Sequence, residues 1–250
     1  MFVDAFARGI QVIRTFGPER EKQTLSDVAA CAGISRASAR RLLHTLLHLN
    51  YVHFDGRYFS LKPTILDLGY SYISSMEFGE FAVEAMHDLA SRTNSSCSIG
   101  ILEGYDVLYV VRISVRRLTA RVFPIGGRFP AHILAMGRPQ LAALSDDALD
   151  DYLAHAAIER FTPYTVVDRD ELRRIIRADR ERGWSVVKRE LDEGVCAIGM
   201  PLRDKSGRVI AGLGLGLRPD RADEPAVIEE ARVEIAKAVE TINGLVRLRG

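Results

Sequence analysis

The sequence predicts an α+β protein in which a small N-terminal domain precedes a larger one built from helices and a mostly antiparallel sheet. Apolar residues follow helical spacing through the first 50 residues and then form two short strand-like runs. After residue 95, longer strand-like runs occur together with helical segments, which is typical of helices packed at one side of a sheet. We expect an N-terminal domain at residues 1–62, a helical linker at 63–78 and a second domain at 79–250.

The composition is typical of a protein from a reducing cytoplasm. With 250 residues, of which 47% are hydrophobic, the chain can bury a sizeable core. Cys31, Cys97 and Cys196 are far apart and odd in number, so they indicate neither a disulfide framework nor a zinc site. No apolar run approaches the roughly 18 residues that cross a bilayer, and no secretory signal pattern opens the chain. We therefore expect a cytoplasmic protein that uses no metal, cofactor or membrane.

The charged residues are unevenly distributed. Residues 1–62 contain nine Lys and Arg against five Asp and Glu, a net charge of +4, whereas residues 63–250 contain 25 against 28, a net charge of −3. A basic first quarter suits contact with a polyanion, and a near-neutral remainder favours a localised contact over general coating of nucleic acid. The alternative is that the imbalance is a chance fluctuation.

The first 50 residues predict three helices. The first ends before a Phe-Gly-Pro break, and its apolar stripe consists of Phe6, Ile10 and Ile13. Thr24, with Asp27 three residues later, predicts the N-cap of a second helix, which Gly33 ends in the position where a left-handed residue is usual. Ser35 caps the third helix. Two helices joined by a short turn that contains glycine form a helix-turn-helix.

The third helix has a leucine face and a basic face. At about 100° per residue, one side collects Ala39, Leu42, Leu43, Leu46 and Leu49. The other side collects Ala37, Arg40, Arg41, His44 and His48. The N-terminal end of such a helix is the part that reaches base edges in the major groove. The candidate DNA contacts are therefore Arg36, Ser38, Arg40 and Arg41. The alternative is an ordinary amphipathic helix with a solvated basic face.

Two short strands follow the third helix. Residues 51–54 and 57–61 are strand-like runs on either side of Asp55-Gly56, a pair typical of a hairpin turn. Three helices and such a hairpin make a winged helix-turn-helix, which favours DNA binding over the solvated-face alternative. Arg57, at the tip, is expected to touch a phosphate or the minor groove.

The remaining sequence predicts a mixed second domain. Helical spacing is found at residues 64–75, 78–92, 138–144, 146–155, 168–182 and 223–248. Strands are expected at SCSIGIL, at VLYVVRI, around Thr119 to Ile125, and at WSVVKRE, VCAIGMPL and VIAGLGLGL.

The last predicted strand has one face without side chains. In GLGLGL, from Gly212 to Leu217, glycines and leucines alternate, so the glycines share a face. The spacing excludes the G-x-G-x-x-G dinucleotide motif. A glycine face often marks close approach of a ligand or of another backbone. The alternative is a bulge or a tightly packed helix.

Five segments together resemble the IclR family of bacterial transcriptional regulators. They are FARGIQVIRTFGP, TLSDVAACAGISRASARRLLHTL, YVHFDGRYFSLKPTILDLG, FPAHILAMGRPQLA and LDEGVCAIGMPL. The first segment, with VRR and GGRFPAH, looks most like the PcaR/PcaU/PobR branch, which regulates aromatic-acid catabolism. The resemblance implies a winged helix on double-stranded operator DNA and an effector-binding domain of GAF-like fold. It also implies a homodimer or a dimer of dimers. The helices between residues 64 and 92 carry more apolar surface than a tether requires, so they are the expected contact.

The resemblance further implies an effector pocket in the second domain. The candidate wall positions are Ala135, Met136, Val187, Ala197, Gly214 and Gly216. Because they are apolar or bare, they suit a ring better than a small polar molecule. A buried carboxylate needs a cation, for which Arg112 and Arg121 are the candidates, whereas Arg116 and Arg117 are expected to be solvated. His132 is a candidate hydrogen-bonding residue, although a structural histidine is the commoner case.

The expected function is transcription regulation at the nucleoid, controlled by a small aromatic carboxylate such as 4-hydroxybenzoate or protocatechuate. RNA polymerase is a further partner if the protein is an activator. One alternative is an IclR-type regulator of another pathway that responds to a short aliphatic organic acid. A DNA-architectural protein is disfavoured by the long sensor-like region. An enzyme with an unrecognised active site is a remote alternative, because the chain lacks H-E-x-x-H, G-x-S-x-G, P-loop and C-x-x-C motifs.

Overall fold

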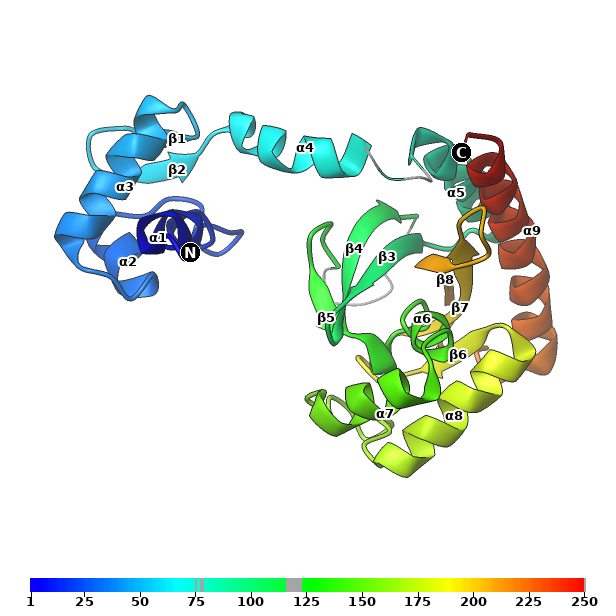
Figure 1. The fold of residues 1–250 in the computed structure, drawn as a ribbon. Helices are drawn as coiled ribbons and strands as arrows, with labels where there is room; N and C mark the ends of the chain where they lie inside the picture. The colour runs from blue at the N-terminus through cyan, green and yellow to red at the C-terminus, as the bar shows by residue number, and fades with distance from the viewer. Residues whose placement is uncertain (75, 77–78, 116–122, 250) are drawn as a thin grey trace. The chain divides into compact units, whose positions relative to one another are not determined.

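The computed structural model describes residues 1–74, 76, 79–115 and 123–249 (Figure 1). The chain separates into two compact units, Met1–Ser75 and Met76–Gly250. The strand predicted around Thr119 to Ile125 falls largely outside the described residues. Within the described ranges, no helix has both the length and the apolar character that crossing a membrane requires.

The first unit is a cluster of helices with a hairpin. Its elements are α1 (Asp4–Ile13), α2 (Leu25–Cys31), α3 (Arg36–His48), β1 (Val52–Phe54), β2 (Phe59–Leu61), the 3-10 turn η1 (Pro63–Leu66) and α4 (Asp67–Ser74). One core joins α1, α2, α3 and β1, through the fully buried side chains of Val12, Val28, Leu43 and Val52. The helix-turn-helix and the wing are therefore confirmed as structural elements.

α1 forms where the apolar spacing predicts it, but most of its apolar stripe faces outward. Phe6 is 71% exposed and Ile10 is 41% exposed, while Ile13 is half-buried. The fully buried contact of α1 comes from Val12 instead. The periodicity identifies the helix correctly, yet of the stripe only Ile13 packs against the core of this unit.

The second unit contains, among the described residues, a six-stranded sheet in the order β5-β4-β3-β8-β7-β6. The strands are β3 (Cys97–Glu103), β4 (Asp106–Ile113), β5 (Arg128–Pro130), β6 (Ser185–Lys188), β7 (Cys196–Arg203) and β8 (Val209–Leu217). All neighbouring strands pair antiparallel. β3 and β8, far apart in the sequence, therefore lie side by side at the centre (Figure 1).

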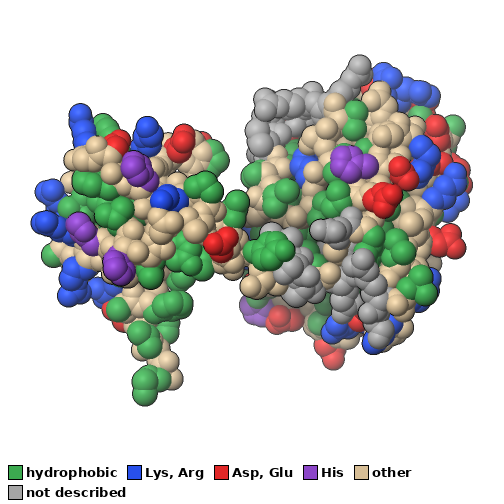
Figure 2. All heavy atoms as spheres, turned by 90° about the horizontal axis from the view of Figure 1, so that it is seen from above, with side chains coloured by type: hydrophobic (Ala, Val, Ile, Leu, Met, Phe, Trp, Pro, Cys, Tyr) green, Lys and Arg blue, Asp and Glu red, His purple; other side chains and the backbone are tan. Residues whose placement is uncertain are grey.

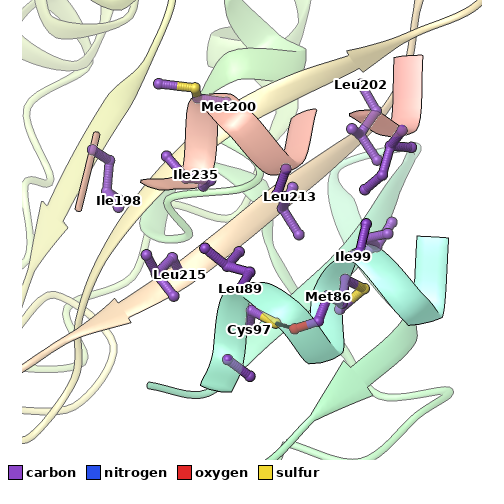
Figure 3. Close-up of a cluster of buried hydrophobic side chains, with 14 of the residues drawn as sticks. Met86, Leu89, Cys97, Ile99, Ile198, Met200, Leu202, Leu213, Leu215 and Ile235 are labelled. Carbon is purple, nitrogen blue, oxygen red and sulfur yellow. Dashed lines mark hydrogen bonds between the residues drawn. The ribbon is translucent and has the colours of Figure 1, made fainter. Parts of the chain in front are cut away.

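Helices cover both faces of this sheet. They are α5 (Gly79–Thr93), the 3-10 turn η2 (Ala131–Ile133), α6 (Arg138–Ala142), α7 (Asp146–His155), α8 (Arg169–Arg182) and α9 (Pro225–Arg249). α5 and α9 share one apolar cluster with the strands, where Met86, Leu89 and Ile235 converge on the sheet (Figure 3). α6 contacts β7 and β8 on the other face, and α7 and α8 pack outside it. The α+β class is confirmed, but helices lie on two faces where the sequence predicts one, because the glycine face admits α6 and the loop before it.

The cluster beneath α5 and α9 generates a stability prediction. Leu89 is 0% exposed, so Leu89→Ala should lower the free energy of unfolding by about 2–5 kcal/mol, through lost apolar burial and the cavity that remains. Leu248 on α9 is 83% exposed, and Leu248→Ala should change that free energy by less than about 0.5 kcal/mol. Urea denaturation followed by circular dichroism measures both. Equal losses in the two variants would contradict this assignment of the core.

Candidate functional site

Two caps and a left-handed residue fix the geometry of the helix-turn-helix. The Thr24 hydroxyl accepts a hydrogen bond from the backbone N–H of Asp27 (3.3 Å), and the Asp27 carboxylate accepts one from the backbone N–H of Thr24 (2.9 Å). Hydrogen bonds from the hydroxyl and the backbone of Thr24 hold the pKa of Asp27 below its usual value. Gly33, at φ +61°, turns the chain, and Ser35 then caps α3 by accepting from the N–H of Ser38 (3.2 Å).

α3 presents the predicted basic face to solvent. Ala39, Leu43 and Leu46 are buried, whereas the exposed residues are Arg36, Ala37, Arg40, Arg41, His44 and His48. In Figure 2, basic and histidine side chains lie together on the surface of the smaller unit. Among the described residues of this unit, the one ion pair joins Arg8 to Asp4 (2.6 Å), so the arginines of α3 are not neutralised. Leu49 departs from the prediction: it is 53% exposed, because α3 ends at His48.

The wing is a tight hairpin with an arginine at its tip. The Asp55 carboxylate accepts hydrogen bonds from the backbone N–H groups of Tyr58 (2.7 Å) and Arg57 (2.9 Å), which lower the pKa of Asp55. The exposed Arg57 guanidinium lies 5.0 Å from the centre of the Tyr58 ring. Gln23 exchanges two backbone hydrogen bonds with Phe59 and thereby ties the wing to the segment before α2. The five predicted DNA contacts thus lie in one unit, on α3 and on the wing.

A row of small residues crosses the sheet on the face opposite α5 and α9. Neighbours in the register are Arg112, Ser98, Gly214, Gly199 and Ser185, from β4, β3, β8, β7 and β6. Between the arginine and the far edge the row holds only serine and glycine. The middle of this face therefore has almost no side chains.

The loop before α6 lies directly on part of this bare face. A Cβ atom at Gly199 would overlap the carbonyl of Ala135, and one at Gly212 would overlap the carbonyl of Met136. Ser185 donates a hydrogen bond to the Ala135 carbonyl (2.5 Å). At these two glycines the bare face reflects close approach of another backbone, one of the explanations that the sequence allowed.

A second part of the bare face is partly accessible. Gly214, Gly216 and Ala197 are half-buried, and the register sets Val187, Ala197 and Gly216 side by side on three strands. A Cβ at Gly214 would lie 3.4 Å from the Met136 Cβ, so Met136 covers one end of this area. The structure therefore brings the six predicted wall positions together around one small surface, with Ala135 and Met136 from the loop and the others from β6, β7 and β8.

Arg112 lies at the edge of the same surface. Its Nη1 donates to the Ser98 hydroxyl (2.9 Å), its Nε donates to the Ser114 hydroxyl (3.1 Å), and its guanidinium lies 5.3 Å from the centre of the Phe123 ring. Sequence reasoning missed Ser98, although its place between Cys97 and Ile99 in the strand pattern was the available signal. Arg121, the other candidate cation, lies outside the described residues, as do Arg116 and Arg117.

His132 is placed in the helical layer, against α7. It is fully buried, its Nδ1 lies 2.9 Å from the Tyr152 hydroxyl, and no described residue gives its Nε2 a hydrogen-bond partner. Burial, followed by the nearby charges of Arg138 and Arg169, lowers the pKa of His132 to about 4, so the imidazole is neutral at pH 7. The contact with Tyr152 joins η2 to α7.

A buried ion pair at the start of α6 fixes the loop before that helix. Arg138 is 2% exposed and pairs with Glu190 (2.6 Å), and it also donates to the carbonyls of His132 (2.8 Å) and Val186 (3.4 Å). Burial raises the pKa of Glu190, an effect that the Arg138 charge opposes. Sequence reasoning missed this pair, because no local pattern joins charges 52 positions apart.

Known proteins resemble this chain in both units. Residues 5–56 match the IclR helix-turn-helix domain, and residues 70–243 match the domain described as bacterial transcriptional regulator IclR C-terminal. The Pca regulon regulatory protein of Pseudomonas putida is 36% identical over 221 residues, which are 88% of this chain and 76% of that protein.

Two solved structures share the fold. A protein from Rhodococcus sp. RHA1, described as a transcriptional regulator, has a TM-score of 0.90 at 36% identity and full coverage of both chains (100% each). An IclR homologue from Microbacterium hydrocarbonoxydans, solved in complex with 4-hydroxybenzoate, has a TM-score of 0.87 at 23% identity, over 98% of this chain and 100% of that one.

These relatives are named as regulators of transcription and not as enzymes. The two matched domains coincide with the winged helix-turn-helix of the first unit and the helix-covered sheet of the second. On this basis, the chain belongs to the IclR family of bacterial transcriptional regulators.

Proposed function

We propose that the regulator binds operator DNA through the exposed face of α3. The single observation that carries this proposal is the row of solvent-facing arginines at the start of α3, none of which takes part in an ion pair with a described residue. Arg36, Arg40 and Arg41 supply charge and bidentate donors, and small neighbours such as Ala37 permit close approach to the duplex. Ser38, three residues after the N-cap Ser35, adds a further contact from α3, and Arg57 in the wing touches a phosphate or the minor groove.

Substitution of the α3 arginines tests the DNA contact. Arg40→Ala should weaken operator binding by about 1–3 kcal/mol and relax specificity at one base position if the guanidinium reads a base, whereas loss of a phosphate contact should weaken all sequences alike. Arg8→Ala on α1 removes an exposed arginine of the same unit and is the matched control. Fluorescence anisotropy at fixed salt measures both. Unchanged operator affinity in Arg40→Ala and in Arg41→Ala would contradict the proposal.

The proposed effector is a monocyclic aromatic carboxylate, of the 4-hydroxybenzoate or protocatechuate type, that controls genes for the breakdown of that compound. The Pca regulon regulatory protein and the homologue solved with 4-hydroxybenzoate support this ligand class. A third relative, from Acinetobacter baylyi, is named p-hydroxybenzoate hydroxylase transcriptional activator and is 28% identical over 250 residues.

The surroundings of Arg112 support an anionic ligand. This half-buried cation forms no ion pair with a described acid, and the segment 116–122 that follows β4 contains no Asp or Glu. Arg112 and Ser98 offer donors to a carboxylate at one edge of the accessible bare surface. Gly214 and Gly216 add no side chain to this half-buried surface, and the Met136 Cβ, 3.4 Å from the Cβ position of Gly214, offers a ring an apolar wall. The Ser96 carbonyl, 3.3 Å from the Cβ position of Gly216, limits the surface at its other end.

Calorimetry with two pocket variants tests the effector. Arg112→Gln should weaken 4-hydroxybenzoate binding by about 1.5–3 kcal/mol, because a charge-assisted hydrogen bond to the carboxylate is lost. Gly214→Val should abolish binding by placing a branched side chain on the accessible surface, and operator binding should be retained in both variants. Arg128→Gln is the matched control, since Arg128 is an arginine of the same unit that already pairs with Glu103.

A short aliphatic acid is the second candidate effector. If no hydroxybenzoate binds below millimolar concentration and glyoxylate or pyruvate binds tightly instead, the aromatic assignment is wrong and the IclR-type regulator acts in another pathway. The coupling of either ligand to DNA binding requires unequal affinity for two arrangements of the regulator, for which about 1–3 kcal/mol would be ordinary.

We further propose that the regulator forms a homodimer. In one alternative, two such dimers assemble into a dimer of dimers. Of the helices expected to carry the contact, α5 buries its apolar residues Met86 and Leu89 within its own unit. The segment from η1 to α4 instead exposes Leu66 (72%), Leu68 (55%) and Tyr70 (68%). We therefore place the contact between protomers on η1 and α4.

Sedimentation tests the dimer. The wild-type chain should be at least dimeric at micromolar concentration and should bind half-sites about 34 Å apart, or a multiple of that distance. The double substitution Leu66→Asp and Leu68→Asp should shift the chain toward monomer, because charges replace buried apolar contacts. Leu248→Asp, at a residue that is 83% exposed on α9, should leave the assembly unchanged. A wild-type monomer, with and without DNA, would contradict the proposal.

A further inference from the structure

Gln140 joins the loop before α6 to the sheet at three backbone groups. It stands in the first turn of α6 and is 5% exposed. Its Nε2 donates to the carbonyls of Met136 (2.8 Å) and Gly100 (3.1 Å), and its Oε1 accepts from the backbone N–H of Leu102 (2.8 Å). Both donors and the acceptor of the carboxamide are therefore used within the protein.

The Gly100 carbonyl and the Leu102 N–H lie at the point where β3 stops pairing with β8. The ladder between β3 and β8 ends at the pair Gly100–Gly212, and at Gly100 the register with β4 also shifts past Val110. Gly100 and Leu102 are two residues apart on the strand, so their backbone groups point to the same edge. Gln140 bonds both of them, as a residue of an adjoining strand would. The Gln140 carboxamide thus supplies hydrogen bonds to the edge of β3 just past the point where its pairing with β8 ends.

The third hydrogen bond fixes Met136, which lies across the bare face. A Cβ at Gly100 would be 3.0 Å from the Met136 Sδ, and a Cβ at Gly214 would be 3.4 Å from the Met136 Cβ. The side chain therefore extends from the region next to Gln140 to the accessible glycine of the effector surface. Any movement of the Met136 carbonyl carries this side chain with it.

We propose that Gln140 is a positioning residue of the effector site, whose carboxamide sets how closely Met136 covers Gly214. The inference rests on the proposed function, because this wall matters for a ligand only if the effector lies on the glycine face. Leucine at position 140 has a similar size but removes all three hydrogen bonds, so the loop loses its polar attachment to β3 and is expected to move. Asparagine keeps the carboxamide but is one methylene too short to reach the same three groups.

Methyl NMR of the full-length protein tests the position of Met136 directly. With [13C-methyl]Met and protonated glycine in a deuterated background, the wild type should show a nuclear Overhauser effect between the Met136 ε-methyl and the Gly100 α-protons. A Cβ atom built on Gly100, in the place of one α-proton, would lie 3.1 Å from the Met136 Cε. The Met136 signal is assigned by its absence in Met136→Leu. Calorimetry with 4-hydroxybenzoate measures the consequence for binding.

Gln140→Leu and Gln140→Asn should lose the nuclear Overhauser effect and weaken 4-hydroxybenzoate binding by at least about tenfold. Ile235→Val, a core substitution on α9 at the opposite face of the sheet, is the control for a general loss of stability. This variant should retain both the nuclear Overhauser effect and the wild-type affinity for 4-hydroxybenzoate. Should Gln140→Leu fail to fold, Gln140→Asn decides alone.

Two results would overturn the inference: a retained nuclear Overhauser effect in the folded variants, or a lost one with unchanged affinity. Failure of the proposed function gives a different result. If the wild type binds no hydroxybenzoate, the aromatic effector is wrong, and the positioning of Met136 by Gln140 is then decided by the nuclear Overhauser effect, with affinity measured for the organic acid that does bind.

Discussion

The second unit depends on the close contact of one backbone with another. Because Gly199 and Gly212 carry no side chain, the Ala135–Met136 segment lies directly on the sheet. The carbonyls in that contact are shielded from water, and a buried carbonyl without a partner costs about 1–3 kcal/mol. Ser185 and Gln140 donate to them. The bare strands therefore require polar side chains beside them, whereas Gly214 and Gly216, which the loop does not cover fully, stay partly accessible.

The parts that follow from the sequence are those whose cause is local. A capping box, a left-handed glycine and a serine cap lie within a few residues of one another, so the limits of α2 and α3 could be predicted together with the outward face of α3. The wing follows from a turn pair between two strand-like runs. The exposed residues of α3 that we propose to contact DNA needed no knowledge of distant contacts, because the helix alone orients them.

The parts that do not follow depend on contacts between distant segments. The glycine alternation in β8 allowed approach of either a ligand or a backbone, and only the fold shows that Gly212 meets the loop while Gly214 stays partly accessible. Helical spacing identified α1 correctly but cannot tell which of its apolar side chains enter the core. Helices on two faces of the sheet were missed for the same reason, because nothing in the helical segments themselves states which face each one covers.

The ion pair between Arg138 and Glu190 constrains how this sequence can change. Each partner is almost fully buried, so replacing one alone leaves an uncompensated charge in the interior, at a cost of about 3–5 kcal/mol. Replacing both with apolar residues of similar volume avoids that cost, but the carbonyls of His132 and Val186 then lose their donor. Exchanges that remove the charge at position 138 or 190 are therefore expected to come in pairs, because a chain that carries only one of the two changes is destabilised.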